Sequence, residues 1–187
     1  MTEIKRLFID TGHGTNNTGS GYDPGARSLY GQEHEIVTRI AGALVYAMSP
    51  LAVEEVPDDI PLRDTPAWIN ARYERGDYLI SLHMNAGPSS ASGTEVIYAV
   101  TAPVGRRLEA AAVSEAIAKV LRVPDRGAKR DIDTPSGKGQ GLAIVRDTRC
   151  PALLIELGFV TNRHDVNAVR NRGVSAVANG IRSLIRP

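Results

Sequence analysis

Two of the four histidines in this sequence occur where an imidazole could bind a metal ion. His13 and His83 each follow a short apolar run of strand length and are set among small or polar residues. Neutral imidazole is a common zinc ligand, but histidines near strand ends are often ordinary hydrogen-bonding residues. Spacing alone therefore leaves both a metal site and a structural role open.

Two glutamates could bring carboxylates to the same site. Glu33 opens an expected helix, and Glu156 interrupts an apolar run near the other end of the chain. A buried carboxylate must be paired, bound to a metal or protonated, because burying it alone costs several kcal/mol. Two imidazoles and one carboxylate leave zinc an open position for water, and a further glutamate can accept the proton of that water. The four side chains together favour a zinc hydrolase.

The elements that must position these residues alternate between two types of pattern. Runs typical of strands occur at residues 7–9, 78–82, 94–100 and 152–157. Helical periods occur at residues 33–48, 65–75, 104–121 and 173–185. This alternation predicts one α/β domain over residues 1–187, with a mostly parallel or mixed twisted sheet and helices on both faces.

The segment 123–141 is rich in Gly, Pro, Asp and Lys, which predicts a long surface loop and one wall of a groove. Its basic residues Lys129, Arg130 and Lys138 could bind carboxylates through charge-assisted hydrogen bonds. Exposed basic residues more often keep a loop soluble, so both interpretations stay open.

Composition excludes several classes of protein. The net charge of +1 and the absence of a basic stripe give no reason to expect a nucleic-acid partner. No apolar run is long enough to span a membrane. The single cysteine, Cys150, precedes an apolar run, so we expect a buried thiol without an internal disulfide partner.

Four blocks of sequence occur in an order typical of one enzyme family. They are residues 8–14 (FIDTGHG), 32–33 (QE), 81–86 (SLHMNA) and 153–162 (LLIELGFVTN), and residues 93–98 (GTEVIY) fit the same pattern. Together they resemble the zinc-dependent N-acetylmuramoyl-L-alanine amidases over nearly the whole chain. The resemblance implies a single zinc exopeptidase-like α/β domain.

The resemblance also implies residue roles. It implies that one zinc ion is bound by His13, Glu33 and His83, and that Glu156 is the catalytic base. Glu35 is an alternative ligand, but the apolar positions of the helix place Glu33 in the family's register. Two acids two positions apart on a helix also face different sides.

Five further residues receive less specific interpretations. Asn85 could orient substrate, support the second histidine or simply form a turn. We expect His34 to face solvent from a helix and His164 to lie at a helix start. The sequence departs from the family pattern at Thr11, where proline is usual, and at Met84, where a small residue is common. These departures put substrate preference in doubt rather than the zinc chemistry.

The implied function is hydrolysis of peptidoglycan at the amide between the lactyl group of N-acetylmuramic acid and L-alanine, in cell-wall lysis or remodelling. Alternatives are a zinc peptidase acting within the stem peptide and an inactive cell-wall binding module. We expect a monomer that does not insert into membranes and acts at the bacterial cell wall. The chain start carries no apolar signal core. We therefore expect an endolysin released by a holin-type route, an enzyme held inside the cell before lysis, or a fragment of a larger exported protein.

Overall fold

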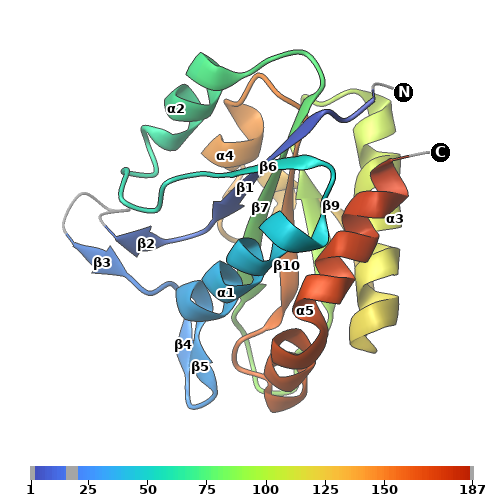
Figure 1. The fold of residues 1–187 in the computed structure, drawn as a ribbon. Helices are drawn as coiled ribbons and strands as arrows, with labels where there is room; N and C mark the ends of the chain where they lie inside the picture. The colour runs from blue at the N-terminus through green and yellow to red at the C-terminus, as the bar shows by residue number, and fades with distance from the viewer. Residues whose placement is uncertain (1–2, 16–20, 186–187) are drawn as a thin grey trace.

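The structure is a computed structural model and describes residues 3–15 and 21–185. Its central sheet contains β1 Arg6–Thr11, β6 Ala52–Glu55, β7 Asp77–Asn85, β8 Thr94–Tyr98, β9 Asp125–Arg130 and β10 Ala152–Phe159. The strand order is β6-β1-β7-β10-β8-β9 (Figure 1). The first four strands in this order pair in parallel, β8 is antiparallel to β10, and β9 is parallel to β8. The expected mixed, mostly parallel sheet is confirmed.

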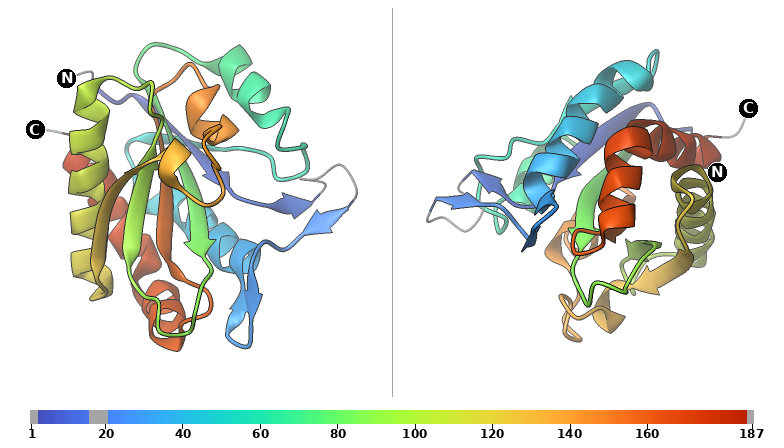
Figure 2. Two further views of the ribbon diagram at one scale, coloured as in Figure 1. Left: turned by 180° about the vertical axis from the view of Figure 1, so that it is seen from behind. Right: turned by 90° about the horizontal axis from the view of Figure 1, so that it is seen from below.

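Helices flank the sheet on both faces, as expected. They are α1 Glu33–Ala47, α2 Thr65–Arg72, α3 Val104–Leu121, α4 Ala143–Arg146 and α5 Arg163–Leu184. Helices α1, α3 and α5 cover one face, whereas α2 and α4 cover part of the other (Figure 2). Each face of the sheet has its own apolar core. Polar side chains of the sheet can therefore gather only where the helices no longer cover it.

Strand β10 shows how the sequence builds both cores. Leu153 and Ile155 pack with α1, α3 and α5, and Leu154 packs with α2 and α4. Because side chains alternate across a strand, a strand covered on both faces is apolar at nearly every position. By the same alternation Glu156 lies on the face of α2 and α4, where the covering helices are short.

The segment 123–141 differs from the expected loop. Strand β9 pairs in parallel with β8 and forms one edge of the sheet, and a 3₁₀-helix follows at Asp131–Asp133. The prediction of a loop was wrong because β9 has the sequence DRGAKR, without a β-branched or aromatic residue. Its strand conformation comes from backbone pairing with β8 rather than from local preference.

One further strand and one helix boundary also differ from expectation. Strand β6 forms the opposite edge and was not predicted, since it is short and half polar. Helix α5 begins at Arg163, ten residues before the expected start at Gly173. The Asn162 side chain accepts hydrogen bonds from the backbone N–H groups of His164 and Asp165, which caps the helix at this earlier point.

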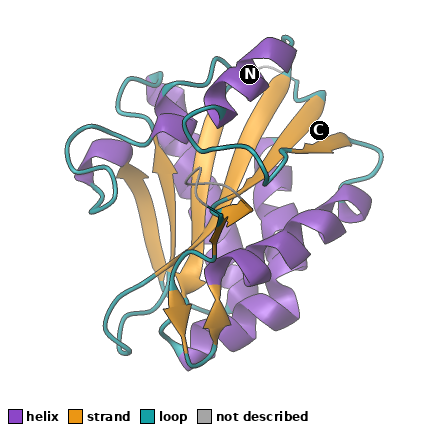
Figure 3. Cartoon of the chain, turned by 90° about the vertical axis from the view of Figure 1, so that its left-hand side faces the viewer, coloured by secondary structure: helices purple, strands orange, loops and turns teal. Residues whose placement is uncertain are grey.

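Two short β-ribbons precede α1 (Figure 3). In the first, β2 Gly14–Thr15 pairs with β3 Tyr22–Asp23, and in the second, β4 Arg27–Ser28 pairs with β5 Gly31–Gln32. They connect the end of β1 to the start of α1, so they determine which residues stand beside both. Within the described ranges, every helix is too short or too polar to cross a membrane.

Candidate metal centre and catalytic site

Three of the candidate residues meet at the carboxyl ends of β1 and β7 and at the first residue of α1. One ligand atom from each of His13, Glu33 and His83 lies within 4.8 Å of the others. Nδ1 of His83 is 2.9 Å from Oε1 of Glu33, and Nε2 of His13 is 3.3 Å from Oε2. The structure therefore gathers two imidazoles around one carboxylate, which is a donor set that suits zinc.

The carboxylate of Glu33 is buried, and four groups bind it. Besides the two imidazoles, Oε1 accepts from Met84 N–H at 3.0 Å and Oε2 accepts from Ala26 N–H at 2.9 Å. Burial alone would raise the pKa of Glu33, but the hydrogen bonds with His13 and His83 outweigh it and hold this pKa far below its usual range. A fully ionised carboxylate is the form that binds a cation.

The same contacts act on the histidines in the opposite direction. Burial lowers the pKa of His13, but Glu33 and Asp23 outweigh it and raise the pKa to about 9. The pKa of His83 is also raised, because Glu33 outweighs the effect of burial. The local field thus favours positive charge between these three residues, and a divalent cation can supply that charge in place of protons.

Of the two acids in the first turn of α1, one points away from the cluster. Glu35 pairs with Arg39 at 2.8 Å on the exposed side of the helix. Glu33 is the carboxylate that reaches both imidazoles.

Asp23 is a member of the site that sequence analysis missed. Its Oδ2 is 2.8 Å from Nδ1 of His13, which leaves Nε2 directed at Glu33. A carboxylate on the far ring nitrogen orients many metal-binding histidines and makes them more basic. Pairing of Gly14 with Asp23 in the first ribbon brings this acid to His13, and such pairing has no local sequence signal.

The chain bends tightly around the two histidines. His13 has a φ of 72°, a left-handed conformation that is uncommon outside glycine and often marks a functional position. A Cβ atom on Gly12 would lie 1.8 Å from Cε1 of His83. A Cβ atom on Gly25 would lie 2.5 Å from Cδ2 of His13 and 2.6 Å from Oε2 of Glu33. Glycine at both positions is a steric requirement of the cluster.

Glu156 stands beside the cluster with one oxygen uncommitted. It pairs in register with His83 on β7 and with Glu95 on β8, so these three side chains share one face. Its Oε2 is buried and has no hydrogen-bond partner among the described residues. Burial chiefly, then the charges of Glu33 and Glu95, raises the pKa of Glu156 to about 7 against the opposing effect of His83. A carboxyl group that titrates near neutrality suits proton transfer.

The other two histidines lie outside the cluster. The expectation that His34 faces solvent was wrong, because its ring is buried under the loop after β1. Its Nδ1 is 3.2 Å from the Gly12 carbonyl oxygen, and its Nε2 is 3.3 Å from Oδ2 of Asp58. His34 therefore supports the loop that carries His13. His164 lies in the first turn of α5, as expected.

The proposed basic residues of segment 123–141 do not gather at the cluster. Arg130 is exposed and pairs through two nitrogens with Asp133, at 2.6 and 2.9 Å. Lys129 pairs in register with Ile97, so it lies on the face that carries Glu156. It is two residues further along β9 than Gly127, the residue level with Glu156, and so lies further from the cluster. Lys138 lies in the turn that follows the 3₁₀-helix.

Asn85 belongs to a hydrogen-bond network that sequence analysis did not predict. Its Nδ2 donates to Oε1 of Glu95 at 2.9 Å, and its Oδ1 accepts from Ala86 N–H at 3.1 Å. Oε2 of Glu95 accepts from Nε of Arg126 at 2.8 Å. Within this network, Glu95 and Arg126 lie on the opposite side of Glu156 from His83, whereas Asn85 follows His83 on β7.

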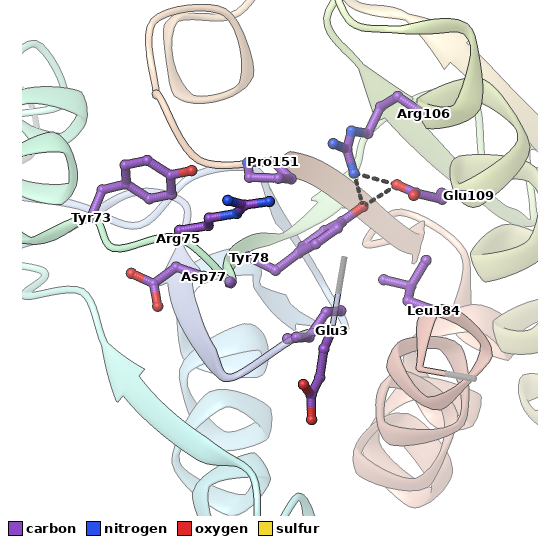
Figure 4. Close-up of a pocket in the computed structure, with 11 residues that line it drawn as sticks. Glu3, Tyr73, Arg75, Asp77, Tyr78, Arg106, Glu109, Pro151 and Leu184 are labelled. Carbon is purple, nitrogen blue, oxygen red and sulfur yellow. Dashed lines mark hydrogen bonds and ion pairs between the residues drawn. The ribbon is translucent and has the colours of Figure 1, made fainter. Parts of the chain in front are cut away.

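Two hollows help to locate the chemistry. A small one of about 60 Å³ adjoins the cluster and is lined by both histidines, Asp58 and Ile144, among others. A larger one of about 360 Å³ lies around the start of β7, at the other end of the sheet (Figure 4). In this larger hollow, the Tyr78 hydroxyl group donates to Glu109 and accepts from Arg106. His13 and His83 line the smaller hollow, and the Glu33 carboxylate contacts both of these imidazoles.

A His–Glu–His cluster with a buried carboxylate lies at the strand ends of a mixed α/β sheet, with Glu156 beside it, and this arrangement is typical of hydrolytic α/β enzymes with a metal site. The sequence profile of the N-acetylmuramoyl-L-alanine amidases matches residues 7–186. The chain belongs to this family of cell-wall amidases.

Individual relatives agree with this membership. N-acetylmuramoyl-L-alanine amidase CwlM of Bacillus licheniformis is 29% identical over 184 residues, which cover 94% of this chain and 65% of CwlM. The sporulation-specific amidase of Bacillus subtilis is 28% identical, with 94% and 64% covered. The crystal structure of an amidase from Clostridium difficile 630 superposes with a TM-score of 0.78 at 26% identity, covering 97% of both chains. The chain thus spans just under two thirds of these two Bacillus enzymes.

The steric requirement at Gly12 yields a prediction. Gly12→Ala should displace the His83 ring and weaken Zn²⁺ binding at least about tenfold, since a shifted ligand loses its coordination geometry. Calorimetric titration with Zn²⁺ measures the effect. Gly105→Ala is the matched control, because a Cβ atom there has no neighbour within 4 Å. Equal Zn²⁺ affinity in both variants would contradict the close approach of Gly12 to His83.

Proposed function

We propose that residues 1–187 form a zinc-dependent catalytic domain that cleaves the amide between the lactyl group of N-acetylmuramic acid and L-alanine of the stem peptide. The observation that carries this proposal is the convergence of His13, Glu33 and His83 beside the uncommitted carboxyl of Glu156. Membership of the amidase family supports peptidoglycan as the substrate. We further propose that the domain acts at the bacterial cell wall and as a monomer.

The donor set fits one zinc ion. His13, Glu33 and His83 would hold it, and Asp23 would orient the ring of His13. Zinc bound there would supply Lewis-acid activation of a water molecule and positive charge beside the carbonyl oxygen of the substrate. Two imidazoles and the ionised carboxylate of Glu33 would leave the ion a position open to that water.

Glu156 would act as the general base and then as the general acid of the reaction. Its ionised carboxylate accepts a proton from the attacking water, whose oxygen forms the new bond to the lactyl carbonyl carbon. The carbon–nitrogen bond then breaks, and Glu156 returns the proton to the departing nitrogen of alanine. A pKa near 7 allows the same group to act as base and then as acid. The products are a lactyl-bearing glycan and a stem peptide with a free amino terminus.

Identification of the products tests the function. Peptidoglycan digested with the zinc-loaded protein should release stem peptides whose new amino group lies on L-alanine, as determined by mass spectrometry. New amino groups at other residues would instead indicate a peptidase acting within the stem peptide. Intact peptidoglycan that is bound but not cut would indicate a binding module.

The base assignment predicts a separation of rate from metal binding. Glu156→Gln keeps the size of the side chain but removes its ability to accept a proton, so the hydrolysis rate should fall by about a hundredfold or more. Elemental analysis should find the same zinc content as in the parent. A variant that keeps its zinc and hydrolyses cell walls at the parental rate would disprove this role. Glu35→Gln, on the exposed side of α1, is the matched control.

The raised pKa of His13 predicts that protons compete with zinc. In the metal-free protein this pKa is about 9, so the imidazole must lose a proton before Nε2 can bind the ion. Zn²⁺ affinity should therefore weaken by about tenfold or more when the pH falls from 7 to 6. Calorimetry in buffers of different ionisation enthalpy should detect proton release on binding. An affinity that does not change with pH would exclude this competition.

A further inference from the structure

A preorganised arginine lies on the same sheet face as the proposed catalytic base. Arg126 follows the first residue of β9, and its Nε donates to Oε2 of Glu95 at 2.8 Å. Its guanidinium lies 5.1 Å from the ring centroid of Phe159. Glu95 is buried, at 7% exposure, and its other oxygen accepts from Asn85. A fixed carboxylate and an aromatic ring thus set the position of this cation.

The guanidinium has donors to spare. The Arg126 side chain is 39% exposed, and its two Nη groups make no hydrogen bond to any described residue. A guanidinium carries five N–H donors in a planar fork that matches a carboxylate. Because Glu95 and Phe159 already hold the side chain, a ligand would lose little of its binding free energy to ordering it. The fixed guanidinium of Arg126 therefore offers unused N–H donors to an anion from solvent.

Sheet register places this arginine at a useful distance from the reacting amide. His83, Glu156, Glu95 and Gly127 form one row across β7, β10, β8 and β9. Neighbouring strands are about 4.8 Å apart, so β9 lies about 10 Å from β10. The Arg126 side chain reaches back over part of this span to contact Glu95. Consecutive Cα atoms of an extended peptide are about 3.8 Å apart, so the second residue of a stem peptide falls within about 8 Å of the amide.

We propose that Arg126 binds the α-carboxylate of the second stem-peptide residue, the acidic residue that follows L-alanine. Glu95 and Phe159 act as positioning residues for the guanidinium. This inference rests on the proposed amidase function and adds a specificity determinant to it. A stem peptide in which this carboxylate is converted to a carboxamide would lose the charge-assisted pair and would bind less well.

The neighbouring basic residues fit this role less well. Both Nε and Nη2 of Arg130 are engaged by Asp133, and this pair lies at the far end of β9. Lys129 is one row further from Glu156 and offers a point charge rather than a planar fork. Arg126 contacts Glu95, the direct neighbour of Glu156 in the sheet, and its geometry is fixed by that contact and by Phe159.

Two soluble muropeptides provide the test. Both carry the disaccharide and a tripeptide, and the second residue is D-isoglutamate in one and D-isoglutamine in the other. The parent should show a KM about tenfold or more lower for the acid than for the amide. Arg126→Gln should raise the KM for the acid by a similar factor, leave the KM for the amide unchanged, and keep kcat within about threefold for both. Arg126→Lys should restore part of the preference.

Matched variants separate recognition from folding. Arg149→Gln removes another exposed arginine that lies over an aromatic ring, that of Tyr73, and should change neither KM. Because Arg126→Gln leaves Glu95 buried without its cation, the double variant with Glu95→Gln is measured beside it. The double variant should also lose the preference for the acid. A loss that is equal for both muropeptides, or no loss at all, would overturn the proposal.

Direct binding distinguishes failure of this inference from failure of the proposed function. In the Glu156→Gln background, calorimetry measures the Kd of each muropeptide without turnover. The acid should bind about tenfold or more tightly than the amide, and Arg126→Gln should abolish that difference. If the parent cut neither muropeptide while this difference persisted, the amidase function would fail and the carboxylate site would stand. Equal Kd values for the two muropeptides would remove the carboxylate site whatever the activity.

Discussion

The buried carboxylate of Glu33 joins segments that are far apart in the chain. From the first residue of α1, it accepts from or faces groups after the end of β1, in the ribbon connection and along β7. An ionised carboxylate is stable in such a place only when its partners replace the lost water. The glycines that let these segments approach, the left-handed backbone of His13 and the hydrogen bond between the His13 ring and Asp23 all follow from that requirement. The local field they create is negative and suited to a cation.

The mixed sheet places Glu156, the proposed proton-transfer group, on the strand next to His83 but outside the His13–Glu33–His83 cluster. Glu156 sits in register between His83 and Glu95, on the face where α2 and α4 are short. Full helical cover would have closed the site, and no cover would have left Glu156 solvated with an ordinary pKa. Partial cover buries one of its oxygens without giving that oxygen a partner among the described residues. The same register gives the site two flanks of different character, a His–Glu–His cluster on one and the paired Glu95 and Arg126 on the other.

Sequence reasoning reached the strongest features of the fold and the site for identifiable reasons. The apolar runs of β1, β7 and β10 and the helical period of α1 and α3 could be predicted, because burial on both faces leaves a clear pattern. His13, Glu33, His83 and Glu156 stand out because each is a polar residue at the border or inside of such a pattern. Asp23, Glu95 and Arg126 could not be predicted, since their partners are set by strand pairing and long-range packing. The buried position of His34 was missed for the same reason, because its own helix gives no sign of the loop that covers it.

Strand β9 has a consequence beyond the site. It is the edge of the sheet, with one side of its backbone unpaired by any other strand of the described sheet, and its six residues carry three cations and one anion. Such an edge discourages another molecule from adding a strand, since like charges would face each other across the new pair. The polar composition that hid β9 from prediction therefore protects the protein from edge-to-edge self-association and aggregation. An edge made of valine and isoleucine would have been easy to recognise and hazardous to expose.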